Sequence, residues 1–481
     1  MAEGNVEENL AVNRERPADG EVDDRRPAVL VVGAGPAGLA AARALKARGL
    51  AYDQVERLDG VGGIWDIDAP GTPMYETAHF NSSKTQSGFH GFPMGEDLPD
   101  YPSHRQVLAY LRDFADAYGL TERIELGASV EELVKDDDGT WIVQLSGGRR
   151  RRYDGVLCCS GTQWVPSMPD LPGSFDGEVM HSLDYRNMDQ LRGRRVLVLG
   201  GGNSACDIVV DASRVAQRAV ISMRRGYWFI PKHVLGVPVD VFAAKGPHLP
   251  ARLQQAVFGT ILKVLYGTPE RWGLPKPDHR LFETHPVLNS HLYLALQHGD
   301  VTPKPGIARI DGSTVSFTDG TSDDFDLIIA ATGFKHAVPY AQRYFGNEQH
   351  PELYLTGFSR EHEGLFGVSF TETNTAAYGH FDALAQMIAS HLWDKSHRPP
   401  RYAEFRRLIR SDYPDLSGGL RFDGSPRHRG YVDATALSRY RERIFRRMGW
   451  RMLAMPGARA ATRSTGDRGL SAVRGGKKVS A

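Results

Sequence analysis

Two glycine-rich turns, each placed directly after an apolar run, constrain this chain more than any other feature. Residues 29–32 lead into the string GAGPAG at 33–38, and residues 196–199 lead into GGGNSA at 200–205. A buried strand that turns through glycines into a helix leaves free backbone N–H groups at the helix start, where they bind a pyrophosphate. Two such turns predict two dinucleotide sites in one α/β chain.

The acidic residue after the first turn indicates which dinucleotide binds there. Glu56 ends the next predicted strand roughly 20 residues beyond Gly33, the spacing of a carboxylate that accepts a hydrogen bond from a ribose 2′-OH. An unphosphorylated adenosine ribose, as in FAD, is therefore expected at the first turn. The residues expected to contact it there are Gly33, Ala34, Gly35, Pro36, Ala37 and Gly38.

Two arginines occupy the corresponding place after the second turn. Arg224 and Arg225 follow the predicted strand 219–223, and an arginine fork suits a 2′-phosphate, which an acid would repel. The pattern favours NADPH at the second turn, with contacts from Gly200, Gly202, Asn203, Ser204 and Ala205. The alternative is that both arginines are solvated charges at a strand end.

An internal repeat supports a fold with two related lobes. The strings DGVLCCSG at 154–161 and DLIIAATG at 326–333 share one pattern, and each follows a possible β-hairpin. We expect an α/β fold with two Rossmann-like dinucleotide-binding domains, the NADPH domain being inserted into the FAD domain. The predicted division is an acidic disordered tail (1–27), FAD domain (28–175), NADPH domain (176–325), returning FAD domain (326–455) and a basic disordered tail (456–481).

Composition restricts the partners and the chemistry. With 58 basic and 58 acidic residues, the chain gives no electrostatic case for nucleic acid or an acidic membrane surface. Three cysteines without a CxxC pair argue against a disulfide reductase and favour a reducing cytoplasm. The histidines show no metal-binding spacing, so no metal is expected and a cofactor must carry the difficult chemistry.

The string between the two turns narrows the function further. Phe175, Gly177, His181 and Tyr185 form the pattern FxGxxxHxxxY, the identifying sequence of the flavin-containing monooxygenases. On this string the chain resembles that family, and the resemblance extends over residues 28–452. It implies hydride transfer from NADPH to FAD, a C4a-(hydro)peroxyflavin, and oxygen transfer to a nitrogen or sulfur atom of a small molecule.

Further segments match the family and add candidate site residues. The string GGIW ending in Gly63, Ile64 and Trp65 resembles its second FAD element, and ATGF at 331–334, with Thr332 and Gly333, resembles its late motif. The alternative for the GGIW string is a structural loop with a core tryptophan. Val130 completes the expected FAD contacts.

Asn81 is the residue expected nearest the chemistry. The resemblance places this asparagine beside the reactive carbon of the flavin, where an amide donates a hydrogen bond without taking up a proton. The alternative is that Asn81 closes a turn with Ser82 and Ser83. His181 and Tyr185 are expected to couple the two lobes, and a purely structural linker role is the alternative.

Two rival functions remain open at this point. Baeyer–Villiger monooxygenases share the architecture but resemble FxGxxxHxxxW, whereas Tyr185 here is followed by Arg186. A flavoprotein redox sensor without catalysis is the third possibility, against which Asn81 argues. The expected partners are a small-molecule substrate and O₂, with a homodimer as the candidate assembly.

The substrate itself is not encoded in a motif. The segment 227–305, rich in proline and aromatic residues, is long enough to shape a substrate pocket. Its amphipathic part, 253–266, is too short to span a bilayer and is predicted to be a packed or dimer-face helix. A closing helix of the FAD lobe is expected at 376–392.

Overall fold

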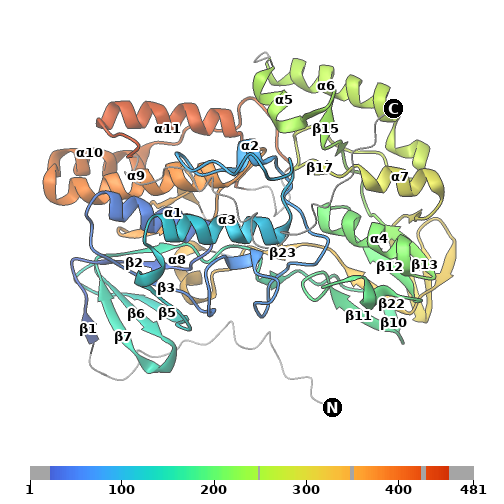
Figure 1. The fold of residues 1–481 in the computed structure, drawn as a ribbon, viewed down its shortest axis with the longest axis horizontal. Helices are drawn as coiled ribbons and strands as arrows, with labels where there is room; N and C mark the ends of the chain where they lie inside the picture. Colours follow the sequence, from blue (N-terminus) through green and yellow to red (C-terminus); the bar gives the residue numbers. More distant parts are fainter. Residues whose placement is uncertain (1–21, 247–249, 347–351, 424–429, 454–481) are drawn as a thin grey trace, which may run out of the picture.

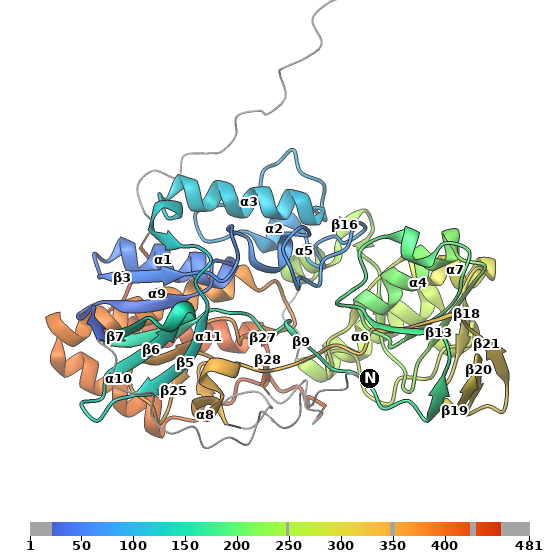
Figure 2. The same cartoon turned by 90° about the horizontal axis from the view of Figure 1, so that it is seen from below.

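Two lobes, each built on a largely parallel β-sheet, make up the protein in this computed structural model (Figures 1 and 2). The structure describes residues 22–246, 250–346, 352–423 and 430–453. The predicted tails up to residue 21 and from 456 lie outside these residues. Among the described helices, none is both long and apolar enough to cross a membrane.

The first lobe is organised around a seven-stranded sheet. Its core strands carry an unbroken apolar pattern and are fully buried, as expected for parallel strands covered on both faces. The order across the sheet is β24 (Leu353–Tyr354), β25 (Phe358–Ser359), β26 (Leu365–Gly367), β8 (Gly155–Cys158), β2 (Val29–Val32), β3 (Tyr52–Val55) and β4 (Ile124–Glu125).

Helices cover this sheet. α1 (Pro36–Ala47) begins directly after the first glycine turn, with proline at its start where no N–H is needed. α9 (Tyr378–His397) packs against α1 and extends beyond the predicted 376–392. A buried ion pair joins the two helices, with Arg43 Nη2 at 2.5 Å from Asp382 Oδ1. The remaining helices of this lobe are α2 (Lys84–Ser87), α3 (His104–Ala117), α8 (Gln342–Phe345), α10 (Pro399–Ser411) and α11 (Ala434–Met448).

A four-stranded sheet beside the first lobe contains the first predicted hairpin. β6 (Trp141–Leu145) pairs antiparallel with β7 (Arg150–Tyr153) and β5 (Val130–Lys135). β1 (Val22–Asp24) adds parallel to β7, so these three residues are ordered although they fell in the predicted tail 1–27. Pairing with β7 explains this difference, and Arg26 and Arg25 add partly exposed ion pairs to Asp24 and Asp53.

The second lobe contains a five-stranded, all-parallel sheet. Its order is β11 (Glu178–His181), β22 (Leu327–Ala330), β12 (Arg195–Leu199), β13 (Arg218–Ser222) and β18 (Thr302–Lys304). α4 (Asn203–Val215) follows the second glycine turn, and α7 (His291–His298) packs beside it. The accompanying small sheet has the order β10 (Gly173–Phe175), β19 (Ile307–Gly312), β20 (Thr314–Phe317) and β21 (Ser322–Asp324).

The chain changes lobes at places that differ from the predicted boundaries 175/176 and 325/326. β10 pairs with β19 of the second lobe, and β22 pairs with β11 and β12 there. The crossing itself is a two-stranded connection between β9 (Val165–Pro166) and β23 (Phe334–Lys335). The strand 327–330 therefore belongs to the second sheet rather than to the segment that returns to the first.

A subsidiary unit lies between the lobes in the view of Figure 2. It is built from α5 (Val239–Lys245), α6 (Ala251–Tyr266) and the short strand pairs β14 (Phe229–Ile230) with β17 (Val287–Leu288) and β15 (His233–Val234) with β16 (Val237–Pro238). β27 (Glu372–Thr373) and β28 (Tyr431–Val432) form a further pair.

A strap of side-chain hydrogen bonds also joins the lobes. Tyr75 lies on a first-lobe loop, and its hydroxyl donates to Asp207 Oδ2 on α4 at 2.9 Å. One turn further along α4, Asp211 accepts from Thr77 Oγ1 at 2.5 Å. Met74, Tyr75 and Ala78 are buried in the apolar core of the second lobe. The loop that leads to Asn81 is thus anchored on the helix that follows the second glycine turn.

Burial of Asp207 has a consequence for stability. Burial raises the pKa of this carboxyl from 3.8 to about 6, so between pH 4 and 6 the native protein binds more protons here than the unfolded chain. We predict that Asp207 makes the free energy of unfolding fall by up to about 3 kcal/mol as pH rises from 4 to 6. Urea denaturation should show a smaller fall in Asp207→Asn than in wild type, because the buried Asp211, whose pKa burial also raises, remains, and an unchanged fall in Asp189→Asn, an exposed control. Equal slopes in wild type and Asp207→Asn would contradict it.

Candidate functional site

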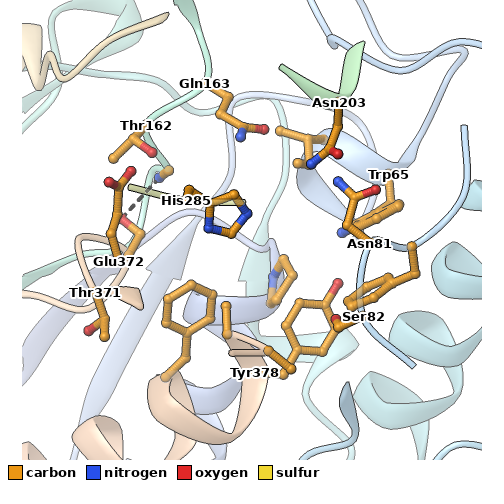
Figure 3. A pocket seen from close by; sticks show the side chains of 18 of the residues that line it. Trp65, Asn81, Ser82, Thr162, Gln163, Asn203, His285, Thr371, Glu372 and Tyr378 are labelled. Atoms are coloured by element: carbon orange, nitrogen blue, oxygen red, sulfur yellow. Dashed lines mark hydrogen bonds between the residues drawn. The ribbon is translucent and has the colours of Figure 1, made fainter. Parts of the chain in front are cut away.

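A cavity of about 810 Å³ lies where the lobes and the subsidiary unit meet, and residues of all three line it. This volume is within the range of small-molecule and cofactor sites. Among the predicted residues, the lining includes Gly33, Gly35, Pro36, Ala37, Glu56, Gly63, Ile64, Trp65, Asn81, Val130, Asn203 and Ser204. Figure 3 shows part of this lining.

The first glycine turn brings backbone close to backbone. Gly33 has φ +107°, and a β-carbon there would lie 2.8 Å from the carbonyl oxygen of Cys159. A β-carbon on Gly38 would lie 1.9 Å from Gly33 O, so Gly38 holds α1 against its strand from behind the cavity. Gly35, the residue before α1, faces the backbone of Gly63. Ala34 is buried beneath this turn.

Glu56 supports the same turn from the end of β3. Its buried carboxylate accepts from the N–H of Ala34 at 2.6 Å and from the N–H of Leu58 at 3.0 Å. Each carboxylate oxygen keeps further acceptor capacity, which faces the cavity that Glu56 lines. Glu56 can therefore hold the turn in place and at the same time accept a hydrogen bond from a ribose hydroxyl.

The second glycine turn leaves open space in front of α4. A β-carbon on Gly200 would meet Ala331 O at 2.3 Å, whereas one on Gly202 would meet nothing within 4 Å. Asn203 lines the cavity and accepts from the N–H of Leu288 at 3.0 Å, while Ala205 is buried behind it. Neither α1 nor α4 has an acidic residue in its first turn. Both helix starts therefore fit a pyrophosphate.

Arg224 and Arg225 lie in different surroundings. Arg224 is exposed at the end of β13. Arg225 is partly buried, and its Nη1 donates to Asp423 Oδ2 at 2.6 Å, with its guanidinium 5.4 Å from the ring of Tyr227. Neither arginine lines the cavity. Of the two, Arg224 is the one whose guanidinium is presented to solvent.

Asn81 and Trp65 lie next to each other in the lining (Figure 3). The Trp65 ring stacks on Phe80 with centroids 5.0 Å apart and an interplanar angle of 11°. Phe80 in turn meets Tyr378 edge to face at 5.3 Å. The Asn81 side chain is exposed, and within the described part of the chain no hydrogen bond engages its amide. The amide is thus free to bond to a ligand.

Sequence reasoning missed one contact that lines the cavity beside Glu56. The Arg57 guanidinium lies 3.9 Å above the ring of Trp164. Both residues line the cavity, together with the loop 160–163. Nothing in the sequence indicated that Arg57 and Trp164 would meet. Their flat, cationic and aromatic surfaces suit a purine ring.

The FxGxxxHxxxY residues lie outside the cavity lining and shape the entry to the second lobe. A β-carbon on Gly177 would lie 2.6 Å from the ring of Phe175 and 2.7 Å from Asp326 O, so a glycine is required there. The buried Tyr185 hydroxyl donates to Asp211 Oδ2 at 3.0 Å, next to the bond from Thr77. This string therefore connects to the strap between the lobes.

His181 forms hydrogen bonds with the segment that connects the two lobes. Its Nε2 donates to Gly333 O at 3.0 Å, while its Nδ1 accepts from the N–H of Leu183 at 3.0 Å. Burial lowers the pKa of the imidazole, consistent with this neutral form. Gly333 O also accepts from the N–H of Ser167, and Thr332 Oγ1 donates to Ser167 O. Thr332 and Gly333 thus contact the connection and do not line the cavity.

The described residues contain no group of three or more His, Cys, Asp or Glu side chains arranged to hold a metal ion. Cys159 is among the lining residues, but Cys158, Cys159 and Cys206 are all buried, and burial raises the pKa of each thiol, which disfavours a reactive thiolate. The lining instead offers amides, aromatic rings and helix starts.

Comparison with known proteins identifies relatives of this chain. A family model described as flavin-binding monooxygenase-like matches residues 26–360. Flavin-containing monooxygenase 5 of Oryctolagus cuniculus is 31% identical over 349 residues, 65% of this chain and 63% of that protein. Indole-3-pyruvate monooxygenase YUCCA1 of Oryza sativa subsp. japonica is 30% identical over 371 residues, 74% of this chain and 90% of that protein.

Solved structures share the fold at lower identity. An ε-caprolactone-bound cyclohexanone monooxygenase has a TM-score of 0.64 at 16% identity, covering 88% of this chain and 98% of that chain. S-allyl-L-cysteine S-oxygenase from Allium sativum has a TM-score of 0.60 at 19% identity, covering 89% of each. The two expected Rossmann-type lobes are confirmed by these likenesses. This chain belongs to the flavin-binding monooxygenase-like family, in which FAD and NADPH are the cofactors.

Proposed function

We propose that the protein is an NADPH- and O₂-dependent monooxygenase that transfers one oxygen atom to a nitrogen or sulfur atom of a small molecule. The free amide of Asn81, placed beside Trp65 in a cavity lined from both glycine turns, carries this proposal. For a sulfide, the balanced reaction converts sulfide, O₂, NADPH and one proton into sulfoxide, water and NADP⁺.

The residues that would hold the two cofactors follow from the fit of the turns. When bound, FAD accepts a hydride from NADPH and, in its reduced form, activates O₂. The FAD contacts we propose are Gly33, Ala34, Gly35, Pro36, Ala37, Gly38, Glu56, Gly63, Ile64, Trp65 and Val130. The NADPH contacts we propose are Gly200, Gly202, Asn203, Ser204, Ala205 and Arg224.

Asn81 would act by hydrogen bonding within a largely apolar wall. An amide N–H donates to an oxygen that carries developing charge without itself losing a proton. The stacked rings of Trp65 and Phe80 form an apolar surface beside the exposed Asn81 amide, and a ligand that covers this amide would exclude water and strengthen the hydrogen bond. Relatives named dimethylaniline monooxygenase [N-oxide-forming] and S-allyl-L-cysteine S-oxygenase support nitrogen or sulfur as the atom oxygenated.

Baeyer–Villiger oxidation of a ketone is the second candidate. The fold likeness to cyclohexanone monooxygenase favours it, because the same lobes there host that chemistry. The pattern at Tyr185 argues against this candidate, because Tyr185 replaces the tryptophan of the Baeyer–Villiger pattern and is followed by Arg186. The Arg186 guanidinium donates to the carbonyls of Leu183 and Tyr185. Ester formation from a ketone, faster than sulfoxide formation from a sulfide, would favour this candidate.

Removal of the Asn81 amide tests the proposal. In Asn81→Ala, NADPH is still consumed, but we expect oxygenated product per NADPH to fall about tenfold or more while hydrogen peroxide rises. The measurement compares NADPH, sulfoxide and peroxide in one reaction with methyl phenyl sulfide. Thr85→Ala, an exposed change on α2, is the matched control and should retain the wild-type ratio. An unchanged ratio in Asn81→Ala would remove Asn81 from the mechanism.

Arg224 is expected to select the phosphorylated cofactor. A hydrogen bond to a charged group contributes roughly 1.5–3 kcal/mol, so Arg224→Ala should raise KM for NADPH about tenfold or more. KM for NADH should stay close to its wild-type value because NADH lacks the 2′-phosphate. Arg192→Ala, a mostly exposed arginine paired with Asp189, serves as control. Equal effects on both cofactors would show that Arg224 does not contact the 2′-phosphate.

A further inference from the structure

The part of the cavity formed by the subsidiary unit differs in chemistry from the part formed by the glycine turns. From α5, α6, the β15–β16 hairpin and the loop before β17 it receives aliphatic and aromatic side chains, among them Leu235, Phe242, Phe258, Ile261, Leu265 and Phe282. We call this part the apolar compartment. It begins next to Asn81, because Asp240 at the start of α5 accepts from the N–H of Ser83 at 2.7 Å.

Three phenylalanines form a continuous aromatic wall in the compartment. Phe258 meets Phe242 edge to face at 6.5 Å and Phe282 at 6.3 Å. Phe258 and Phe282 are only partly buried in the small apolar cluster around Ile230 and Leu262. Their remaining apolar surface faces the cavity and would be removed from water by an apolar ligand.

The described lining of the compartment offers no lysine or arginine to an anionic ligand. Within the described residues of segment 227–305, the ionisable side chains that line the cavity are Asp240 and His285. Both oxygens of Asp240 already accept backbone N–H groups, from Ser83 and from Val241. His285 Nδ1 lies 2.8 Å from the hydroxyl of Tyr431. An anionic group carried into this compartment would lose its hydration without gaining a lysine or arginine partner.

Backbone strain is concentrated at the same place. Four non-glycine residues have positive φ in the described chain, and two of them, Leu235 at +51° and Phe282 at +68°, line the compartment. Leu235 stands at the tip of the β15–β16 hairpin with 90% of its surface exposed. Neither a positive φ nor exposure of the side chain to water stabilises a leucine. Residues held in such strained backbone conformations are often found at ligand sites.

The far end of the compartment opens to solvent. Leu265 is 57% exposed and Ile261 is 37% exposed, yet both line the cavity, as Leu235 does. An apolar chain that runs along α6 would cover these three side chains. Val264 on the same helix is 77% exposed and does not line the cavity.

From these observations we infer that the apolar compartment binds an elongated, uncharged alkyl or aryl tail of the substrate, and that Leu235 determines specificity for tail length. The inference rests on the proposed function for the position of the reacting atom, which lies at the Asn81 end while the tail extends toward Leu235. Substrates whose tail ends in an anionic group inside the compartment are excluded by desolvation rather than by size.

A series of n-alkyl methyl sulfides from ethyl to octyl tests the inference on the FAD-loaded enzyme. We expect kcat/KM to rise about fourfold per methylene until the chain reaches Leu235, because each buried CH₂ contributes that factor. Shorter sulfides whose tail ends in a carboxylate inside the compartment should lose this rise. Leu235→Asn keeps a residue that tolerates positive φ and should lower kcat/KM for octyl methyl sulfide about tenfold. Val264→Asn is the matched control, with no change expected.

Calorimetry separates this inference from the proposed function. Binding of the same sulfides to the enzyme with FAD and NADP⁺ should show a heat capacity change that becomes more negative with chain length. Binding that follows chain length while only hydrogen peroxide forms would support the compartment and overturn the proposed function. Sulfoxide formation with kcat/KM independent of chain length, or equal losses in Leu235→Asn and Val264→Asn, would overturn the inference alone.

Discussion

The architecture depends on a backbone contact that leaves no room for a side chain. The carbonyl of Gly33 occupies the place where a β-carbon on Gly38 would lie, and this contact holds the start of α1 against the end of β2. Because the helix cannot move away from its strand, its first N–H groups face the cavity at a fixed position. Gly63 lies against Gly35 from the other side, so the segment that carries Trp65 is positioned by the same turn.

The second lobe repeats the strand, glycine turn and helix, with Ala205 in the place of Gly38, and its helix also links the lobes. α4 carries Asp207 and Asp211 one turn apart, and both accept hydrogen bonds from the first-lobe loop that precedes Asn81. A helix whose start fits a pyrophosphate is therefore also the helix on which the Asn81 loop is anchored. Binding at the second turn and the position of the Asn81 amide are structurally connected through two hydrogen bonds.

Local signals in the sequence predicted the elements but not their partners across the fold. The glycine turns, the buried strands and both hairpins are present as the patterns indicated. The strand 327–330 resembles 155–158 so closely that periodicity could not tell which sheet it joins. Its place in the second sheet follows from pairing with β11 and β12. The contacts of Arg57 with Trp164 and of Tyr75 with Asp207 join residues more than a hundred positions apart in the sequence, a separation that no local pattern encodes.

The strength of a sequence signal reflects steric constraint more than chemistry. FxGxxxHxxxY is the most specific string in the chain, yet its residues pack at the lobe entry, where Gly177 has no room for a side chain and His181 has both ring nitrogens engaged. Asn81, by contrast, lies in a short polar segment that could equally close a turn. A single amide in an open cavity needs few neighbours of fixed identity, whereas a crossing between two lobes needs several. The residues that contact a substrate therefore leave the weaker trace in the sequence.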